Sequence, residues 1–137
     1  MNFGTKPTDE QAAEIEAMTE PFTSALAAGD IDALLTHYTD DCVVMPPNSP
    51  ALHGKDAIRA WAEALPPISE FSGQHDEIAC FGDVAILRGS YEMTLAIPGV
   101  PEPIRDVGSY MEIRERQADG RWLLTRDIFN TDMPVLD

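Results

Sequence analysis

Positive charge is scarce in this chain of 137 residues. Nine Lys and Arg residues stand against 24 Asp and Glu residues, which gives a formal net charge of −15 at pH 7. Proteins that bind phosphate backbones or anionic membranes cluster their Lys and Arg side chains. Here the only lysines are Lys6 and Lys55, and the arginines are scattered. Nucleic acid and membrane surfaces are therefore excluded as expected partners.

Long apolar runs are also absent, and cysteines are rare. No apolar stretch approaches the ~20 residues of a membrane span, and residues 1–6 lack the basic and then apolar pattern of a signal peptide. The two cysteines, Cys42 and Cys80, lie among apolar neighbours. We expect buried free thiols in a cytoplasmic protein, with a disulfide as the alternative.

The usual signatures of catalytic and cofactor sites are missing as well. The chain has no glycine-rich phosphate loop and no G-x-S-x-G nucleophile elbow. Its three histidines, His37, His53 and His75, do not fall at metal-ligand spacings. We therefore expect neither a metal nor a cofactor.

Enough apolar residues remain, 44% of the chain, to fill the core of one domain spanning residues 1–137. Thr8 and Gln11 form a capping-box pattern that opens a first helix, and Gly29 is a C-cap candidate. Pro21 predicts a bend or a restart within that helix. Asp30 caps a short second helix whose inner side includes Tyr38, and residues 55–65 form a third.

The second half of the chain predicts antiparallel strands. Apolar runs alternate with turn signals such as Gly82-Asp83 and Asp119-Gly120. After a short strand at 42–45, the expected strands are 71–81, 84–97, 104–117 and 121–131. Helices followed by a meander predict an α+β fold in which helices cover a strongly curved sheet and leave a cavity at the wide end.

Two charged residues stand inside apolar strands. Asp127 lies in LLTRDIFN and Arg88 in VAILRGSY, and a carboxylate at such a position must be exposed, paired or hydrogen-bonded. Both side chains point either to the outer face of the sheet or into the cavity as a charge pair, and the pattern leaves both readings open. Tyr38 and Trp61 are core residues or, given a cavity, part of its wall.

Residues 25–34 (ALAAGDIDAL) and 37–48 (HYTDDCVVMPPN) resemble the opening of SnoaL-like domains in the NTF2-like superfamily. Residues 52–58, 119–122 and 126–134 continue the likeness, which covers about residues 9–134 and is most similar to the DUF4440 branch. The resemblance implies a ketosteroid isomerase-like cone with three N-terminal helices packed on a curved, mostly antiparallel sheet. It also implies a homodimer that forms through the outer face of the sheet.

Two enzymes of this superfamily offer tests of the site residues. The tyrosine and two acids of ketosteroid isomerase fall on Phe22, Pro46 and near Ser109, so that chemistry is not expected. In limonene-epoxide hydrolase, the arginine and the last-strand aspartate match Arg88 and Asp127. This likeness implies that both residues face the cavity.

The resemblance thus implies a protein that binds a small hydrophobic or polyketide-like molecule in a mainly apolar pocket. One hypothesis is an acid/base enzyme of the isomerase, hydrolase or cyclase type, with Asp127 as base or orienter, Arg88 as its charge partner and Tyr38 as a donor. The alternative is a non-catalytic ligand-binding or association module. The residues expected to line the pocket are Phe22, Met45, Trp61, Ser90 and Phe129.

Overall fold

The computed structural model describes residues 4–134, which begin with a long helix, α1 (Asp9–Ala28). The Thr8 hydroxyl accepts a hydrogen bond from the Gln11 backbone N–H, and the Gln11 side-chain Oε1 accepts one from the Thr8 backbone N–H, so the predicted capping box is confirmed. Gly29 adopts the left-handed conformation expected of a C-cap, with φ of 67°. The helix does not restart at Pro21 but continues through it.

Two further helices and two strands follow. The short α2 (Ile31–Leu35) is capped by Asp30 as predicted, and α3 (Gly54–Glu63) lies close to the predicted range. Strand β1 (Tyr38–Met45) starts earlier than the sequence indicated, so Tyr38 belongs to a strand and not to α2. A two-residue strand, β2 (Leu52–His53), pairs with β1 and was not predicted.

Four long strands complete a six-stranded sheet in the order β2-β1-β6-β5-β4-β3. They are β3 (Ile68–Phe81), β4 (Val84–Leu95), β5 (Ile104–Arg116) and β6 (Trp122–Phe129). All neighbouring pairs are antiparallel except β1 and β6, which are parallel. The expected α+β fold, with helices on a curved and mostly antiparallel sheet, is confirmed.

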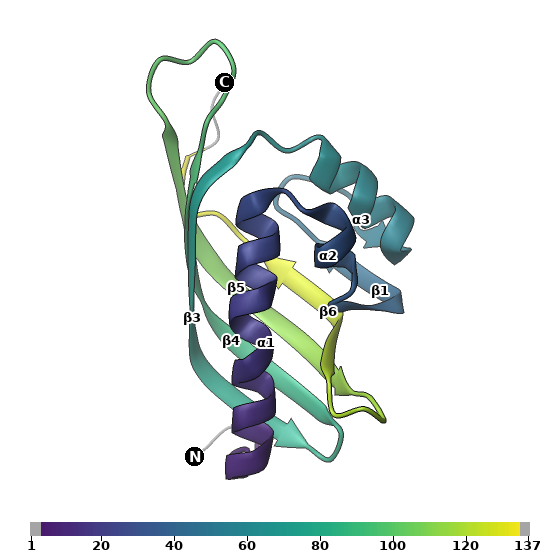
Figure 1. The fold of residues 1–137 in the computed structure, drawn as a ribbon. Helices are drawn as coiled ribbons and strands as arrows, with labels where there is room; N and C mark the ends of the chain where they lie inside the picture. The colour runs from purple at the N-terminus through teal and green to yellow at the C-terminus, as the bar shows by residue number, and fades with distance from the viewer. Residues whose placement is uncertain (1–3, 135–137) are drawn as a thin grey trace.

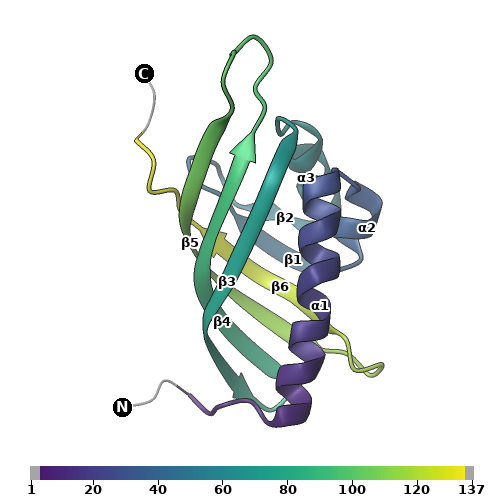
Figure 2. The same cartoon turned by 60° about the vertical axis from the view of Figure 1, so that its left-hand side comes forward.

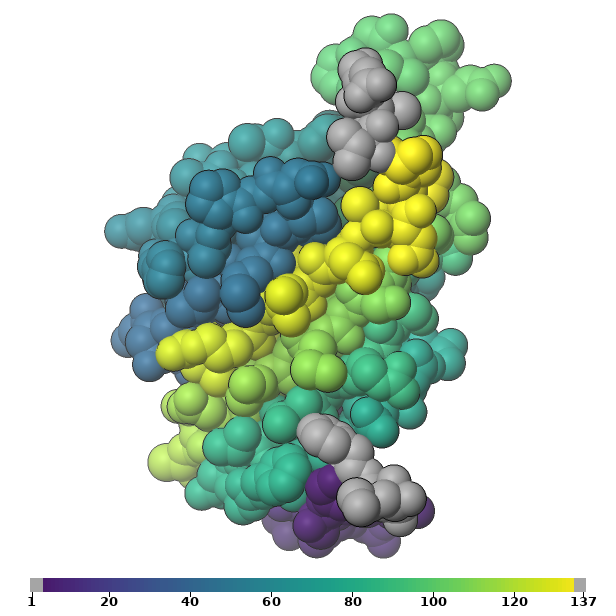
Figure 3. All heavy atoms as spheres, turned by 180° about the vertical axis from the view of Figure 1, so that it is seen from behind, coloured from purple at the N-terminus to yellow at the C-terminus, as the bar shows by residue number. Residues whose placement is uncertain are grey.

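The sheet curls around α1, which lies along its inner face, while α2 and α3 cover the end of the sheet near β1 (Figures 1 and 2). Seen from behind, strands of the second half of the chain form the lower and right-hand parts of the surface, the segment with β1 and β2 forms the upper left, and α1 is visible only at the lower end (Figure 3). The outer face of the sheet is thus left uncovered by the helices. No helix within residues 4–134 has the length and hydropathy that a membrane span requires.

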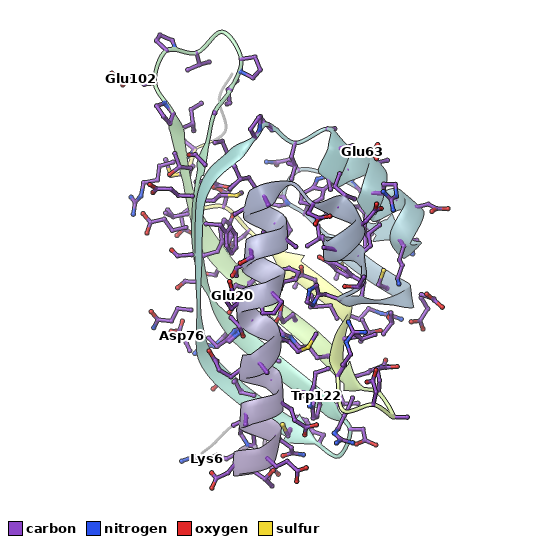
Figure 4. All side chains as sticks on the ribbon, in the orientation of Figure 1. Lys6, Glu20, Glu63, Asp76, Glu102 and Trp122 are labelled. Carbon is purple, nitrogen blue, oxygen red and sulfur yellow. The ribbon has the colours of Figure 1, made fainter. Side chains whose placement is uncertain are left out.

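The buried side chains form two clusters. One contains Ile15, Cys80, Ala85, Leu87 and Trp122 at the end of the sheet near the α1 N-terminus (Figure 4). The other joins the C-terminal half of α1 to α2, α3, β1 and β6, and includes Cys42. Both cysteines are buried and free, as expected.

Candidate functional site

A cavity of about 110 Å³ opens between α1, α3 and the inner face of the sheet. Most of its wall is apolar or aromatic, and α1, β1, α3 and all four long strands contribute to it. The polar or titratable side chains on the wall are Thr19, Thr23, Tyr38, His75, Tyr91, Tyr110, Glu112, Arg114 and Asp127.

An ion pair buried within β5 forms part of this wall. Arg114 donates from Nε and Nη2 to Glu112 Oε1, at 2.8 and 2.6 Å. The two side chains share one face of the strand because they are two residues apart. They are only 4% and 5% exposed, so the pair is shielded from solvent. Glu112 and Arg114 therefore place one negative and one positive charge beside the cavity.

Asp127 lies directly opposite Glu112 in the β5–β6 ladder and faces the same cavity. Within residues 4–134 its carboxyl group has no hydrogen bond and no ion pair. Burial, and next the nearby Glu112 carboxylate, raise the pKa of Asp127 to about 8, although Arg114 acts in the opposite direction. The carboxyl group is therefore protonated at neutral pH and becomes charged only in mildly alkaline solution.

Tyr38 comes from β1, the parallel neighbour of β6. Its ring is buried against Phe22, and it lines the cavity. Burial, and next the Asp127 carboxylate, raise the pKa of the Tyr38 hydroxyl well above its ordinary value. Tyr38 therefore stays a neutral phenol that can donate a hydrogen bond near Asp127.

A second polar group lies on the β3 side of the cavity. His75 Nδ1 and the Tyr110 hydroxyl form a short hydrogen bond, and His75 Nε2 lies 3.3 Å from Thr19 Oγ1 on α1. The Tyr110 hydroxyl also lies 3.0 Å from the Gln74 carbonyl. Burial lowers the pKa of His75, so the ring is neutral at pH 7. Since both ring nitrogens are engaged, His75 holds Tyr110 and Thr19 in position.

Aromatic rings complete the wall. Phe129 contacts Trp61 and Tyr91 edge-to-face, with ring centroids 6.0 and 5.8 Å apart, and Phe71 stacks on Tyr91 at 6.4 Å. The Tyr91 hydroxyl is fixed by a 2.7 Å hydrogen bond to the Asn130 carbonyl. These rings present a firm apolar surface to any occupant.

Comparisons with known proteins identify the family. The model of the SnoaL-like domain family matches residues 19–125. The chain belongs to this family. The predicted resemblance to SnoaL-like domains is therefore confirmed, and the fold is one shared with NTF2-like proteins.

Solved structures agree with this SnoaL-like fold. A ketosteroid isomerase-like protein from Erwinia carotovora atroseptica shares 24% identity over 93% of this chain and 100% of its own, with a TM-score of 0.82. A conserved protein from Planctomyces limnophilus shares 22% identity over 90% of this chain and 99% of its own, with a TM-score of 0.79. An NTF2-like protein from Novosphingobium aromaticivorans shares 17% identity over 92% of this chain and 84% of its own, with a TM-score of 0.70. The search of curated proteins gave no match.

In this SnoaL-like domain, several residues singled out from the sequence lie on the cavity wall, and others do not. The wall includes Asp127, Tyr38, Phe22, Trp61 and Phe129. The remaining three, Arg88, Ser90 and Met45, are absent from it.

The largest difference from the sequence interpretation concerns Arg88, which lies outside the cavity. It is an exposed residue on β4 that pairs with Glu77 of β3 at 3.2 Å, and the expected Arg88–Asp127 pair does not form. The physical reason is strand alternation, because the inner face of β4 carries Leu87 and Tyr91. Ser90 shares the outer face with Arg88 and is exposed.

Met45 also departs from the expected pocket. It lies opposite Ile128 in the parallel β1–β6 ladder, and Ile128 is 48% exposed on the outer face. The neighbouring Val44, which lies opposite Asp127, lines the cavity in its place.

Sequence reasoning missed Glu112 and Arg114, and it gave His75 and Tyr110 no role in the cavity. In the run Tyr110-Met111-Glu112-Ile113-Arg114, ordinary alternation would turn the apolar residues inward. The structure does the opposite: Glu112 and Arg114 are buried while Met111 is 44% exposed. The close spacing of opposite charges at 112 and 114 is the signal that could have suggested a pair able to share a buried face.

No group of three or more His, Cys, Asp or Glu side chains in residues 4–134 is arranged to hold a metal ion.

Proposed function

We propose that the cavity binds a small, mainly apolar molecule and that Asp127 exchanges a proton with it. The observation that carries the proposal is the Asp127 carboxyl group, which faces an apolar cavity without a partner among residues 4–134. A structural carboxylate in such surroundings is ordinarily hydrogen-bonded or paired. A carboxyl group without a hydrogen-bond partner is available to bind a ligand.

The site supports proton transfer next to a carbonyl group. With a pKa of about 8, Asp127 is a stronger base than an ordinary carboxylate once it ionises, which happens in mildly alkaline solution. Tyr38 remains protonated and can donate to the carbonyl oxygen on which negative charge develops. Such a step is used by isomerases and cyclases that act on hydrophobic or polyketide-like compounds, whereas a hydrolase would use the same carboxylate to activate water. The residues differ from those of ketosteroid isomerase, whose expected base position is occupied by Pro46.

Exchange of the α-hydrogens of cyclohexanone in D₂O, followed by NMR, tests this function. We expect the protein to catalyse exchange at a rate that rises with pH through about 8 as Asp127 ionises. Asp127→Asn removes the base and should lower the rate at least 100-fold. Tyr38→Phe removes the donor and should lower it about tenfold.

Arg88→Gln is the matched control, because Arg88 lies on the outer face and should not affect exchange. Binding is followed in parallel through the fluorescence of Trp61, which lines the cavity. Exchange that is unchanged in Asp127→Asn would exclude Asp127 as the base. Binding without exchange in the wild-type protein would favour the alternative, a non-catalytic ligand-binding module.

We also propose that the protein forms a homodimer through the outer face of the sheet. Met111 and Ile128, which are paired across β5 and β6, are 44% and 48% exposed there. Adjacent apolar side chains on an otherwise charged surface are typical of an interface. The face is the one left open by the helices (Figure 3).

Sedimentation equilibrium tests the dimer. We expect the wild-type protein to be dimeric and a Met111→Glu/Ile128→Glu variant to be monomeric, because four carboxylates would face one another across a symmetric interface. Phe81→Glu is the control, since Phe81 is 48% exposed at the far end of β3. A monomeric wild-type protein would contradict the proposal.

The cytoplasm is the compartment we propose. The two buried free cysteines support a reducing environment.

A further inference from the structure

A second hollow of about 400 Å³ adjoins the cavity and shares part of its wall. It lies between the C-terminal end of α1, α2, and the segment from the end of α3 to the start of β3, which includes Pro66 and Pro67. Four apolar residues line both spaces and form the boundary between them: Leu26, Leu34, Leu65 and Ile68. We refer to the first space as the inner cavity and to the second as the outer hollow.

The inner cavity by itself limits the ligand to about one ring. An apolar cavity of ~150 Å³ holds benzene, and the inner cavity has about 110 Å³. Sites that enclose larger ligands measure ~300–1,000 Å³. A ligand with more than one ring or a long chain therefore needs the outer hollow as well.

The walls of the outer hollow are mostly apolar, and its charged residues are both acidic. They are Asp30 and Glu63, and no Lys or Arg lines this space. The Asp30 carboxylate is occupied as the cap of α2, where it accepts from the Ala33 backbone at 3.2 Å. Glu63 is exposed at the end of α3 and has no such partner among residues 4–134 (Figure 4).

The nearest basic residues on α3 are already paired. Lys55 lies 3.5 Å from Asp40, and Arg59 donates to Asp32 at 2.8 Å. The chain as a whole carries a net charge of −15. An anionic group in the outer hollow would therefore meet repulsion from Glu63 and no compensating cation.

We propose that the two spaces form one extended site for an elongated, uncharged molecule. Its head, a ring with a carbonyl or hydroxyl oxygen, occupies the inner cavity, and its alkyl chain passes between the four boundary side chains into the outer hollow. The position of the head rests on the proposed function of Asp127. The chemistry of the outer hollow excludes chains that end in a carboxylate or a phosphate.

Binding of three aryl ketones, measured by calorimetry and by Trp61 fluorescence, tests the extended site. The probes are acetophenone, octanophenone, and the analogue of octanophenone with a terminal carboxylate on its chain. We expect octanophenone to bind at least tenfold more tightly than acetophenone, because its chain buries additional methylene groups. In low salt, the carboxylate analogue should bind at least tenfold more weakly than octanophenone.

Two variants test where the alkyl chain of the ligand lies. Ala28 is exposed at the end of α1 and lines only the outer hollow, so Ala28→Phe should remove the octanophenone advantage and leave acetophenone binding unchanged. Glu63→Lys should restore binding of the carboxylate analogue. Its matched control is Glu102→Lys, which makes the same charge change at the tip of the β4–β5 loop (Figure 4).

The outcomes separate this inference from the proposed function. If acetophenone binds but octanophenone gains nothing, or if Ala28→Phe leaves the gain intact, the extended site is wrong while the inner site stands. If Glu63→Lys and Glu102→Lys act alike on the carboxylate analogue, the exclusion of anionic chains by Glu63 is wrong. If neither ketone binds, both the proposed function and the extended site fail.

Discussion

Replacing Arg114 with methionine is expected to destabilise the protein by about 3–5 kcal/mol. The substitution keeps an extended side chain of moderate size but removes the cation that lies 2.6 Å from Glu112. Glu112 would then be a buried carboxylate without a counter-ion, next to Asp127 in the adjacent strand. Removing one member of a buried ion pair has a cost of this size because the remaining charge cannot regain its hydration.

Urea unfolding at pH 7 measures this effect. Arg88→Met is the matched control, because Arg88 also pairs with a glutamate, at 3.2 Å, but these two side chains are 48% and 38% exposed to solvent. An exposed pair contributes ~0–1 kcal/mol, so this control should change stability little. Equal losses in the two variants would show that burial does not set the strength of the Arg114–Glu112 pair.

A second substitution distinguishes two causes of the lost stability: the unpaired charge of Glu112 and the loss of packing around Arg114. In the double variant Glu112→Gln/Arg114→Met, no buried charge remains at these two positions, and we expect most of the lost stability to return. If the double variant is as unstable as Arg114→Met, the loss comes from packing around the guanidinium group instead. The result bears on function, since this pair fixes the electrostatic surroundings of Asp127.

The fold followed from local signals that act over a few residues. The capping box at Thr8, the cap at Asp30 and the turn at Asp119-Gly120 each fix a boundary through a nearby hydrogen bond or a glycine with positive φ. Tyr38 was misassigned because the start of β1 depends on its pairing with β6, about 85 residues away in the chain. No local signal carries that information.

The candidate site was harder to predict because it depends on which face of each strand turns inward. Asp127 could be singled out as a carboxylate within an apolar strand. Its charged neighbours could not, since the inward orientation of β5 places Glu112 and Arg114 inside and Met111 outside. A bulge between β5 and β6, at Ile113 and Arg114, further shifts the register in a way that simple alternation misses.

Arg88 shows that a family resemblance also fails to predict which face of a strand a residue occupies. Its alignment with a catalytic arginine implied a position in the cavity, yet the inner face of β4 carries Leu87 and Tyr91. The arginine that does reach the cavity, Arg114, comes from the neighbouring strand. A correct fold does not guarantee that a polar residue matched by alignment lies on the same face of its strand.

Asp127→Asn is expected to stabilise the protein at neutral and alkaline pH while abolishing proton transfer. The pKa of Asp127 is raised from 3.8 to about 8 in the folded protein. Between these values the folded state holds a proton that the unfolded state releases, so stability falls as pH rises from about 4 to 8. Asparagine resembles the neutral carboxyl group and has no charge to bury, so the variant lacks this pH-dependent loss.

The predicted difference therefore has a defined pH window. Near pH 4 the variant and the wild-type protein should be about equally stable, and the advantage of the variant should grow to about 2–5 kcal/mol by pH 8 and then level off. Thermal and urea unfolding from pH 4 to pH 9 measure it, with Asp41→Asn, at an exposed position on β1, as the control. A variant less stable than wild type at pH 8 would mean that ionised Asp127 is well accommodated in the fold. A stabilised but inactive variant would show that the protein retains an unfavourable buried acid because its reaction requires one.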